Sequence, residues 1–376
     1  MRLTNVKLGL FLSYGMSLAG WERLGLFARE SAVYQALTSS LAEIALVTYG
    51  DKSDEAYKKR LGDIRVVCNR QGLPLGEYTQ HLAAMLKPIF MSNTAVFKSN
   101  QVQGSDVAMR MAQALNKKFV ARCGFLLSDF TERQFGQQSP EAQRARELER
   151  LVFTQADRVA VTTPVIKERV VKDYRLSENR VAVIPNYVDT TLFRPMPAAR
   201  IPRRLCTICR LEPQKNLFAL LEAIHGLDVE VVIAGNGTQA EQLRKTIKAK
   251  KLDVHLLGVV DHRTLPELFN SAEAFILPSH YESHPKVLLE AMACGLPVIG
   301  TKVVGIRELI AHGKNGYLCE TSPQSIRQAI LEVLGDTTLQ ERMGENAREY
   351  IEQRFSLKKV VQMELAMLSE VTGQKS

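Results

Sequence analysis

Short apolar runs alternate with helical patterns in the first half of the chain. Stretches with apolar residues at helical spacing occur at 21–37, 106–115 and 141–155. The runs around them have the length and composition of buried strands, at 7–12, 44–48, 64–67, 95–98, 119–122, 158–161 and 181–184. Strands that alternate with helices are typical of βαβ units, which build a parallel sheet. The pattern predicts a doubly wound, Rossmann-like α/β domain over residues 1–190.

The same rhythm begins again after residue 200. Strand-like runs occur at 205–209, 229–234, 254–257, 274–277 and 298–300. Thr238 and Thr264 each precede a Glu by three residues, which is the spacing of a capping box at a helix start. Ser322, followed by a proline, predicts a third helix start. These patterns predict a second Rossmann-like domain over residues 200–355.

Two segments lie outside these domains. Residues 190–204 are rich in proline and small or basic residues, so we expect them to form the linker. Residues 356–376 predict a final amphipathic helix with Ser356 as its cap. In proteins with two such domains a last helix can pack back on the first domain, although the pattern itself does not decide this. The chain is therefore expected to fold as two doubly wound domains that face a cleft.

Composition narrows the class of protein. Of 376 residues, 45% are hydrophobic and 24% charged, which excludes collagen-like and disordered chains. No apolar run approaches the ~18 residues of a membrane span, and the run at 8–12 is too short for a secretion signal. We therefore expect a cytoplasmic protein. Cys206 and Cys209 form a C-x-x-C pair on a predicted strand, where residues three apart point to opposite faces, so we expect buried thiols and no metal site.

Positive charge is concentrated in the first half. Residues 1–195 carry 27 Lys and Arg against 19 Asp and Glu, whereas residues 196–376 carry 22 against 21. This imbalance indicates an anionic partner for the first half, such as a charged acceptor or a membrane surface. The alternative is an ordinary solvated surface. A nucleic-acid partner is not expected, because no aromatic platform is interleaved with the basic residues and no groove-reading motif occurs.

The strongest chemical signal is the segment FILPSHYESHPKVLLEAMACGLPVIG, which ends at Gly300. It predicts a strand, a short loop, a helix that opens near 283–285, a turn and another strand. Amides at the start of such a helix suit a phosphate. Glu282 lies in the loop and Glu290 on the helix, where a carboxylate can accept from two neighbouring hydroxyls of a ribose. Residues around this helix start are candidate donor contacts: Ser283, His284, Lys286 and Val287.

Two further clusters follow predicted strands of the second half. Arg210 and Lys215 stand five residues apart after the first of these strands, an arrangement that suits a diphosphate. Gly235, Asn236 and Gly237 follow the second strand, where glycines let the backbone approach a ligand or make a tight turn. Each cluster alone is weak evidence, because basic residues at loop ends are usually solvated.

Together these motifs resemble family 4 glycosyltransferases, which have the GT-B fold. The resemblance covers residues 182–355 and is carried by RLEPQKNL, VIAGNGTQ, ESHPKVLLE with AMACGLPVIG, and GIRELIAHGKNGYL. It implies that Arg210 and Lys215 bind the donor diphosphate and that Glu290 binds the nucleotide ribose. It also implies that Glu282 lies beside the donor sugar or its phosphates. Arg210, Lys215 and Glu282 are thus the expected catalytic residues.

The first half resembles the family more loosely. Gly15 and Gly20 match the glycine-rich loop whose backbone approaches the donor phosphates, although many relatives have two adjacent glycines there. Asn100, Gln101 and Arg122 occupy loops in which many relatives carry a histidine, and they are the candidate residues on the acceptor side. The missing histidine indicates that the acceptor differs from that of better-known members.

The resemblance implies a retaining transferase that moves a sugar from a UDP- or GDP-sugar to a glycan or lipid-linked acceptor, in surface polysaccharide or glycoconjugate synthesis. The nucleotide sugar is a substrate, and no cofactor is expected. No D-x-D triplet occurs, so we expect a metal-independent enzyme in which cationic side chains and helix amides stabilise the leaving group. Peripheral contact with the inner face of a membrane is a second expectation. The alternatives are an epimerase or phosphorylase on the same scaffold, or a non-catalytic basic binding protein.

Overall fold

The computed structural model describes residues 2–91, 94–197 and 200–374. The chain divides into two compact units. Unit 1 contains residues 1–185 and 360–376, and unit 2 contains residues 186–359. Within the described residues, no helix combines the length and apolar character that a membrane crossing requires.

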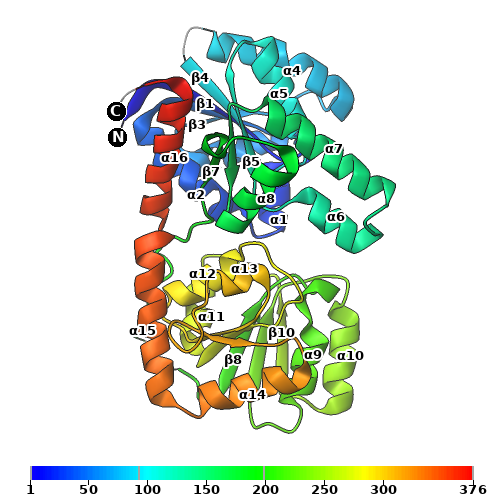
Figure 1. Ribbon diagram of the computed structural model, residues 1–376, viewed down its shortest axis with the longest axis vertical. Coiled ribbons are helices and arrows are strands. Elements are labelled where there is room, and N and C mark those ends of the chain that lie inside the picture. The colour runs from blue at the N-terminus through cyan, green and yellow to red at the C-terminus, as the bar shows by residue number, and fades with distance from the viewer. Residues whose placement is uncertain (1, 92–93, 198–199, 375–376) are drawn as a thin grey trace. The chain divides into compact units, whose positions relative to one another are not determined.

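Unit 1 is built on a parallel sheet of seven strands in the order β3-β2-β1-β4-β5-β6-β7 (Figure 1). The order reverses between β1 and β4, which is where doubly wound sheets bind ligands at the strands' carboxyl ends. The strands are β1 (Leu3–Phe11), β2 (Leu41–Val47), β3 (Ile64–Val67), β4 (Thr94–Ser99), β5 (Lys118–Cys123), β6 (Arg158–Val161) and β7 (Val181–Val183).

The α-helices of unit 1 mostly connect successive strands. They are α1 (Leu18–Arg23), α2 (Phe27–Leu37), α3 (Lys58–Leu61), α4 (Leu75–Phe90), α5 (Ser105–Ala114), α6 (Leu127–Phe135), α7 (Pro140–Gln155) and α8 (Pro164–Tyr174). The core of this unit lies between the sheet and these helices, where Phe90 packs edge-on against Phe97 with ring centroids 4.8 Å apart. The predicted helix at 21–37 is two helices, because Gly25 adopts a positive φ after α1.

Unit 2 contains a parallel sheet of six strands in the order β10-β9-β8-β11-β12-β13. Its order reverses between β8 and β11. The strands are β8 (Arg204–Ile208), β9 (Glu230–Ala234), β10 (Val254–Gly258), β11 (Ala274–Leu277), β12 (Val298–Thr301) and β13 (Tyr317–Cys319). The helices are α9 (Leu217–Ile224), α10 (Ala240–Lys250), α11 (Leu265–Ser271), α12 (Lys286–Ala293), α13 (Val304–Arg307), α14 (Pro323–Leu334) and α15 (Thr337–Arg354). β13, a strand of three residues, was not predicted from the sequence.

The helix starts at Thr264 and Ser322 are confirmed, whereas the hydrogen bonds of the two predicted capping boxes do not form. The Thr238 hydroxyl donates to Glu212, 2.6 Å away, and α10 begins two residues later without a side-chain cap. The Thr264 hydroxyl donates to the Asp261 carbonyl oxygen at 3.0 Å. Both hydroxyls donate to oxygen atoms outside their helices, and neither helix start has a side-chain cap. Ser322 accepts from the backbone amide of Ser325, as predicted.

The last helix, α16 (Leu357–Thr372), begins in unit 2, and its residues from Val360 onward belong to unit 1. Figure 1 shows it in red beside the sheet of unit 1. Glu364 on this helix forms an ion pair with Lys98 of β4, and both side chains are almost completely buried. Glu370, which is exposed, pairs with Arg158 at 3.3 Å. The buried pair ties the helix to a central strand of unit 1.

Candidate functional site

Unit 2 brings the two main predicted clusters together at the reversal point of its sheet. Arg210 and Lys215 follow β8, while Glu282 follows the adjacent strand β11. Because both strands are parallel, their carboxyl ends meet at one edge and place these loops side by side. The predicted cations and the first predicted carboxylate therefore share one site, although they are 67 residues apart in the chain.

Lys215 and Glu282 form an ion pair at the centre of this site. Their side chains are only 10% and 8% exposed. The Ser279 hydroxyl donates to the same Glu282 oxygen, Oε1, at 2.6 Å. Arg210 differs, because it is exposed and donates to Gln214 Oε1 at 3.1 Å. The site thus holds one fixed ammonium group and one exposed guanidinium group.

Hydrogen bonds to backbone carbonyl oxygens hold the two loops together. Asn216, in a left-handed conformation, donates its side-chain amide to the carbonyl oxygen of Pro278 at 3.1 Å and of Thr321 at 2.9 Å. The Gln214 side chain donates to the Tyr281 carbonyl oxygen at 2.8 Å, and the His280 amide donates to the Gln214 carbonyl oxygen at 2.8 Å. These contacts fix the relative positions of the cations and Glu282. The sequence analysis missed the role of Asn216, although it lies within the RLEPQKNL motif.

The glycines after β9 permit close packing on the loop after β8. A Cβ atom at Gly235 would lie 1.8 Å from the Cys209 carbonyl oxygen, and one at Gly237 would lie 2.5 Å from the Leu211 carbonyl oxygen. Asn236, which is exposed, accepts from the Leu211 amide through its carbonyl oxygen at 2.9 Å. Glycine is therefore required here because the chain packs closely against the neighbouring backbone. Burial of this region raises the pKa of the Cys209 thiol to about 11.

The helix that follows β11 begins at Lys286, just after the predicted opening at 283–285. It has no side-chain cap, and Val287 lies in its first turn. His284 is buried, and its carbonyl oxygen accepts from the Asn186 side chain at 2.7 Å. A Cβ atom at Gly305 would lie 2.1 Å from the Ser283 carbonyl oxygen, so a glycine is required there too. The turn before α12 is thus held by contacts on both sides.

Glu290 lies in the second turn of α12 and is 1% exposed. Its Oε1 atom is 2.8 Å from Nε2 of His262, a buried residue in the loop after β10. No sequence motif pointed to His262 as a site residue. The contact joins residues 28 positions apart, so no local spacing could have revealed it.

The predicted residues of unit 1 lie near the carboxyl ends of its strands. Gly15, with a φ of 79°, follows β1, and the Gly20 amide donates to the Ser17 hydroxyl at 2.9 Å within α1. The Asn100 amide donates to the Phe11 carbonyl oxygen at 2.8 Å, and Gln101 Oε1 accepts from the Gly124 amide at 3.0 Å. Arg122 lies on β5 and not in a loop.

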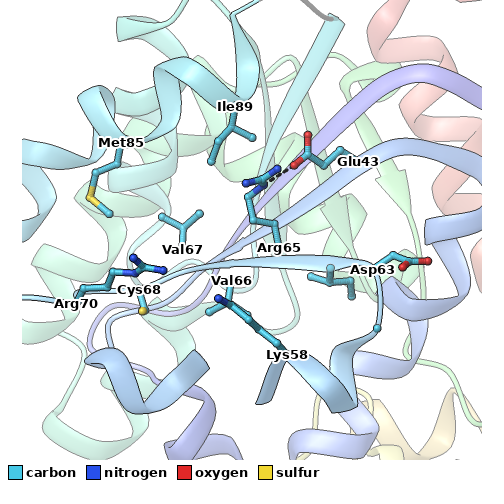
Figure 2. A pocket seen from close by; sticks show the side chains of 12 residues that line it. Glu43, Lys58, Asp63, Arg65, Val66, Val67, Cys68, Arg70, Met85 and Ile89 are labelled. Atoms are coloured by element: carbon cyan, nitrogen blue, oxygen red, sulfur yellow. Dashed lines mark hydrogen bonds and ion pairs between the residues drawn. The ribbon is translucent and has the colours of Figure 1, made fainter. Parts of the chain in front are cut away.

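A separate hollow of about 610 Å³ runs along β3 at the edge of the unit 1 sheet (Figure 2). Met85 and Ile89 of α4 line one side. Figure 2 shows Arg65 pointing toward Glu43, with which it forms an ion pair. Arg70 pairs with Glu55. No predicted site residue lines this hollow, and each of its two arginines already pairs with a carboxylate.

Two family models match the chain in succession. Residues 35–192 match Glycosyltransferase Family 4, and residues 192–350 match Glycosyl transferases group 1. N-acetyl-alpha-D-glucosaminyl L-malate synthase of Bacillus anthracis is 34% identical over 144 residues, 38% of each chain. D-inositol 3-phosphate glycosyltransferase of Paenarthrobacter aurescens is 30% identical over 240 residues, 57% of each chain. The chain thus spans between about a third and three fifths of the length of these relatives.

Solved structures of similar fold cover nearly the whole chain. Sucrose-phosphate synthase from Thermosynechococcus elongatus has a TM-score of 0.78 at 19% identity, covering 98% of this chain and all of its own. HepE from Anabaena, in complex with UDP and glucose, has a TM-score of 0.75 at 20% identity, covering 97% of this chain and 99% of its own. At these identities the likeness establishes the fold.

Proposed function

Because this chain belongs to the family 4 glycosyltransferases and has the GT-B fold, we propose that it transfers a sugar from a nucleotide-sugar donor to an acceptor. The observation that carries the proposal is the grouping of Arg210, Lys215 and Glu282 at the reversal point of the unit 2 sheet. This is the edge at which doubly wound domains bind nucleotides.

Arg210 and Lys215 stabilise the departing diphosphate. As the anomeric bond breaks, negative charge grows on the phosphate oxygens, and preorganised cations lower the energy of that state. Glu282 holds Lys215 by an ion pair, and Ser279 in turn holds Glu282. The ammonium group of Lys215 therefore need not be ordered during the reaction. Amides in the first turn of α12, at Lys286 and Val287, add positive potential.

The donor is a UDP- or GDP-sugar, and UDP is favoured because HepE was crystallised with UDP-glucose. Glu290 accepts hydrogen bonds from the ribose hydroxyls. Since this carboxylate is 1% exposed, a ribose reaches it only when the covering side chains move aside. Gly235, Asn236 and Gly237 shape the floor of the donor site through their close packing on the loop after β8.

The reaction retains the anomeric configuration and needs no metal ion. In a same-face mechanism, the leaving phosphate oxygen takes the proton of the acceptor hydroxyl as that hydroxyl bonds to the anomeric carbon. This step requires no protein base. The cationic pair replaces the charge that a divalent cation would otherwise supply.

The acceptor, a glycan or a lipid-linked molecule, binds unit 1 near Asn100, Gln101 and Arg122. The excess of positive charge in residues 1–195 favours an anionic acceptor or peripheral contact with the inner face of a membrane. Both are consistent with roles in the synthesis of surface polysaccharides or glycoconjugates.

A thermal-shift screen tests donor binding. A ligand present at one hundred times its dissociation constant stabilises a protein by about 2.7 kcal/mol, which raises the melting temperature measurably. We expect UDP or GDP, with or without an attached sugar, to raise the melting temperature of the wild type. The exposed Glu267→Gln variant serves as a control and should respond equally. Absence of a shift with every nucleoside diphosphate at millimolar concentration would exclude the proposal.

A further inference from the structure

His262 and Glu290 form a buried pair. Nε2 of His262 lies 2.8 Å from Oε1 of Glu290, and the two side chains are 9% and 2% exposed. An ionised carboxylate accepts hydrogen bonds but cannot donate, so the imidazole must carry its proton on Nε2. The neighbours of Glu290 on α12 are buried and apolar, namely Leu288, Leu289, Ala291, Met292 and Ala293. His262 therefore supplies a polar contact that this carboxylate needs in an apolar setting.

The imidazole is itself held in place. The ring of Phe193, which is fully buried, packs against it with centroids 5.0 Å apart. The preceding residue, Asp261, anchors the turn: its carbonyl oxygen accepts from the Thr264 amide at 3.0 Å, and its carboxylate accepts from the Arg263 amide at 2.8 Å. A ring fixed by packing and by its turn fixes the carboxylate that it contacts.

We propose that His262 is a positioning residue, which holds the Glu290 carboxylate in the orientation that accepts hydrogen bonds from the two vicinal hydroxyls of the donor ribose. The proposal rests on the proposed function. Gripping two adjacent hydroxyls requires the plane of the carboxylate to be set within about 10–20°. His262 engages one oxygen of Glu290, so rotation about the last side-chain bond is restricted before the donor arrives.

A purely structural histidine would affect stability alone, whereas a positioning histidine affects recognition of the ribose. The ligands that separate these effects are UDP and GDP with their 2′,3′-dideoxy counterparts, which lack both hydroxyls. The informative variant is His262→Phe, which keeps a ring against Phe193 and removes the N–H donor. His262→Gln retains an N–H donor at similar reach. If the His262→Phe variant does not fold, His262→Leu is used in its place.

Calorimetric titration of each ligand gives the test. We expect the wild type to bind the ribose form about 10–100 times more tightly than the dideoxy form, as for hydrogen bonds to a charged group. His262→Phe should lose most of this preference while binding the dideoxy form within about threefold of the wild type. His262→Gln should restore much of the preference. When Glu290→Gln is already present, adding His262→Phe should cause little further loss of the preference for the ribose form.

The outcomes separate this inference from the function on which it rests. One possible outcome is that the wild type prefers the ribose form, that Glu290→Gln abolishes this preference and that His262→Phe keeps it. In that case His262 does not position Glu290, whereas the assignment of the donor site stands. If the wild type binds no nucleoside diphosphate, or binds the ribose and dideoxy forms equally, Glu290 does not bind the ribose. The proposed role of His262 is then wrong as well.

Discussion

At the scale of single residues, the site separates fixed groups from exposed ones. Lys215, Glu282 and Glu290 are largely buried and each has a hydrogen-bonded partner, whereas Arg210 is exposed. Buried partners keep charged groups in one geometry, at the cost of removing them from water. Lys215 and Glu282 therefore need little reorganisation during a reaction, which is the property that electrostatic stabilisation of a leaving group requires.

Glu290→Gln should weaken nucleotide binding about 10- to 100-fold, because hydrogen bonds to a charged group contribute about 1.5–3 kcal/mol. The side chain keeps its shape, so the melting temperature without ligand should change little. Calorimetric titration with UDP and GDP measures the effect, and Glu267→Gln on the surface of α11 is the control. Equal affinities for wild type and Glu290→Gln would remove this residue from the site.

At the scale of elements, the strand–helix alternation predicted both sheets, and the reversal points of the sheets located the site. What the sequence could not provide were contacts between distant segments. Ser279 and Asn216 hold the predicted cluster from neighbouring loops, and His262 reaches Glu290 from the loop after β10. These contacts depend on the order of strands in the sheet, which the local hydrophobic pattern does not encode.

The glycine motif after β9 provides a test of loop packing. Gly235→Ala should lower the free energy of unfolding by several kcal/mol, because its φ is 134° and its Cβ would lie 1.8 Å from the Cys209 carbonyl oxygen. Gly226→Ala is the matched control, with a φ of 76° and nothing within 4 Å, and should lose only about 1–3 kcal/mol. Urea unfolding measures both. Equal losses would show that the close backbone approach is unimportant.

The ion pair between Lys98 and Glu364 tests how α16 is attached to unit 1. Glu364→Leu alone leaves a buried ammonium group without its carboxylate, which should lower the free energy of unfolding by about 3–5 kcal/mol. Lys98→Met combined with Glu364→Leu should recover most of that loss. Glu370→Leu, which removes an exposed partner of Arg158, should change stability by less than about 1 kcal/mol. A double variant as unstable as the single one would argue against this explanation.

At the scale of the whole molecule, the uneven charge predicts weaker attraction to a membrane than the sequence indicated. Five basic residues of the first half are candidate membrane contacts: Lys58, Lys59, Arg60, Lys117 and Lys118. Ion pairs link Lys58 with Glu55, Arg60 with Glu22 and Lys118 with Asp157. Each cation near anionic lipid contributes about 1 kcal/mol, and a paired carboxylate reduces that gain.

Co-sedimentation with lipid vesicles measures the remaining attraction. We expect the protein to pellet with phosphatidylserine-containing vesicles at low salt and to be released at high salt, because the Debye length shortens to about 3 Å at 1 M. Lys58→Glu with Lys59→Glu should reduce pelleting, whereas Lys245→Glu in unit 2 should not. Absence of pelleting with anionic vesicles would contradict membrane contact and favour a water-soluble anionic acceptor.

The central claim is that unit 2 activates a nucleotide sugar through Arg210 and Lys215, and its most direct test is phosphorus NMR of donor turnover. UDP- and GDP-sugars are incubated with the protein in excess chelator and without acceptor, so that water takes the sugar, and release of the nucleoside diphosphate is followed over time. The wild type should release it, and Arg210→Ala or Lys215→Ala should lower kcat by about 10²–10³ with a smaller effect on donor affinity. Lys245→Ala should match the wild type. A strict need for added divalent metal, or equal turnover in all four proteins, would contradict the account.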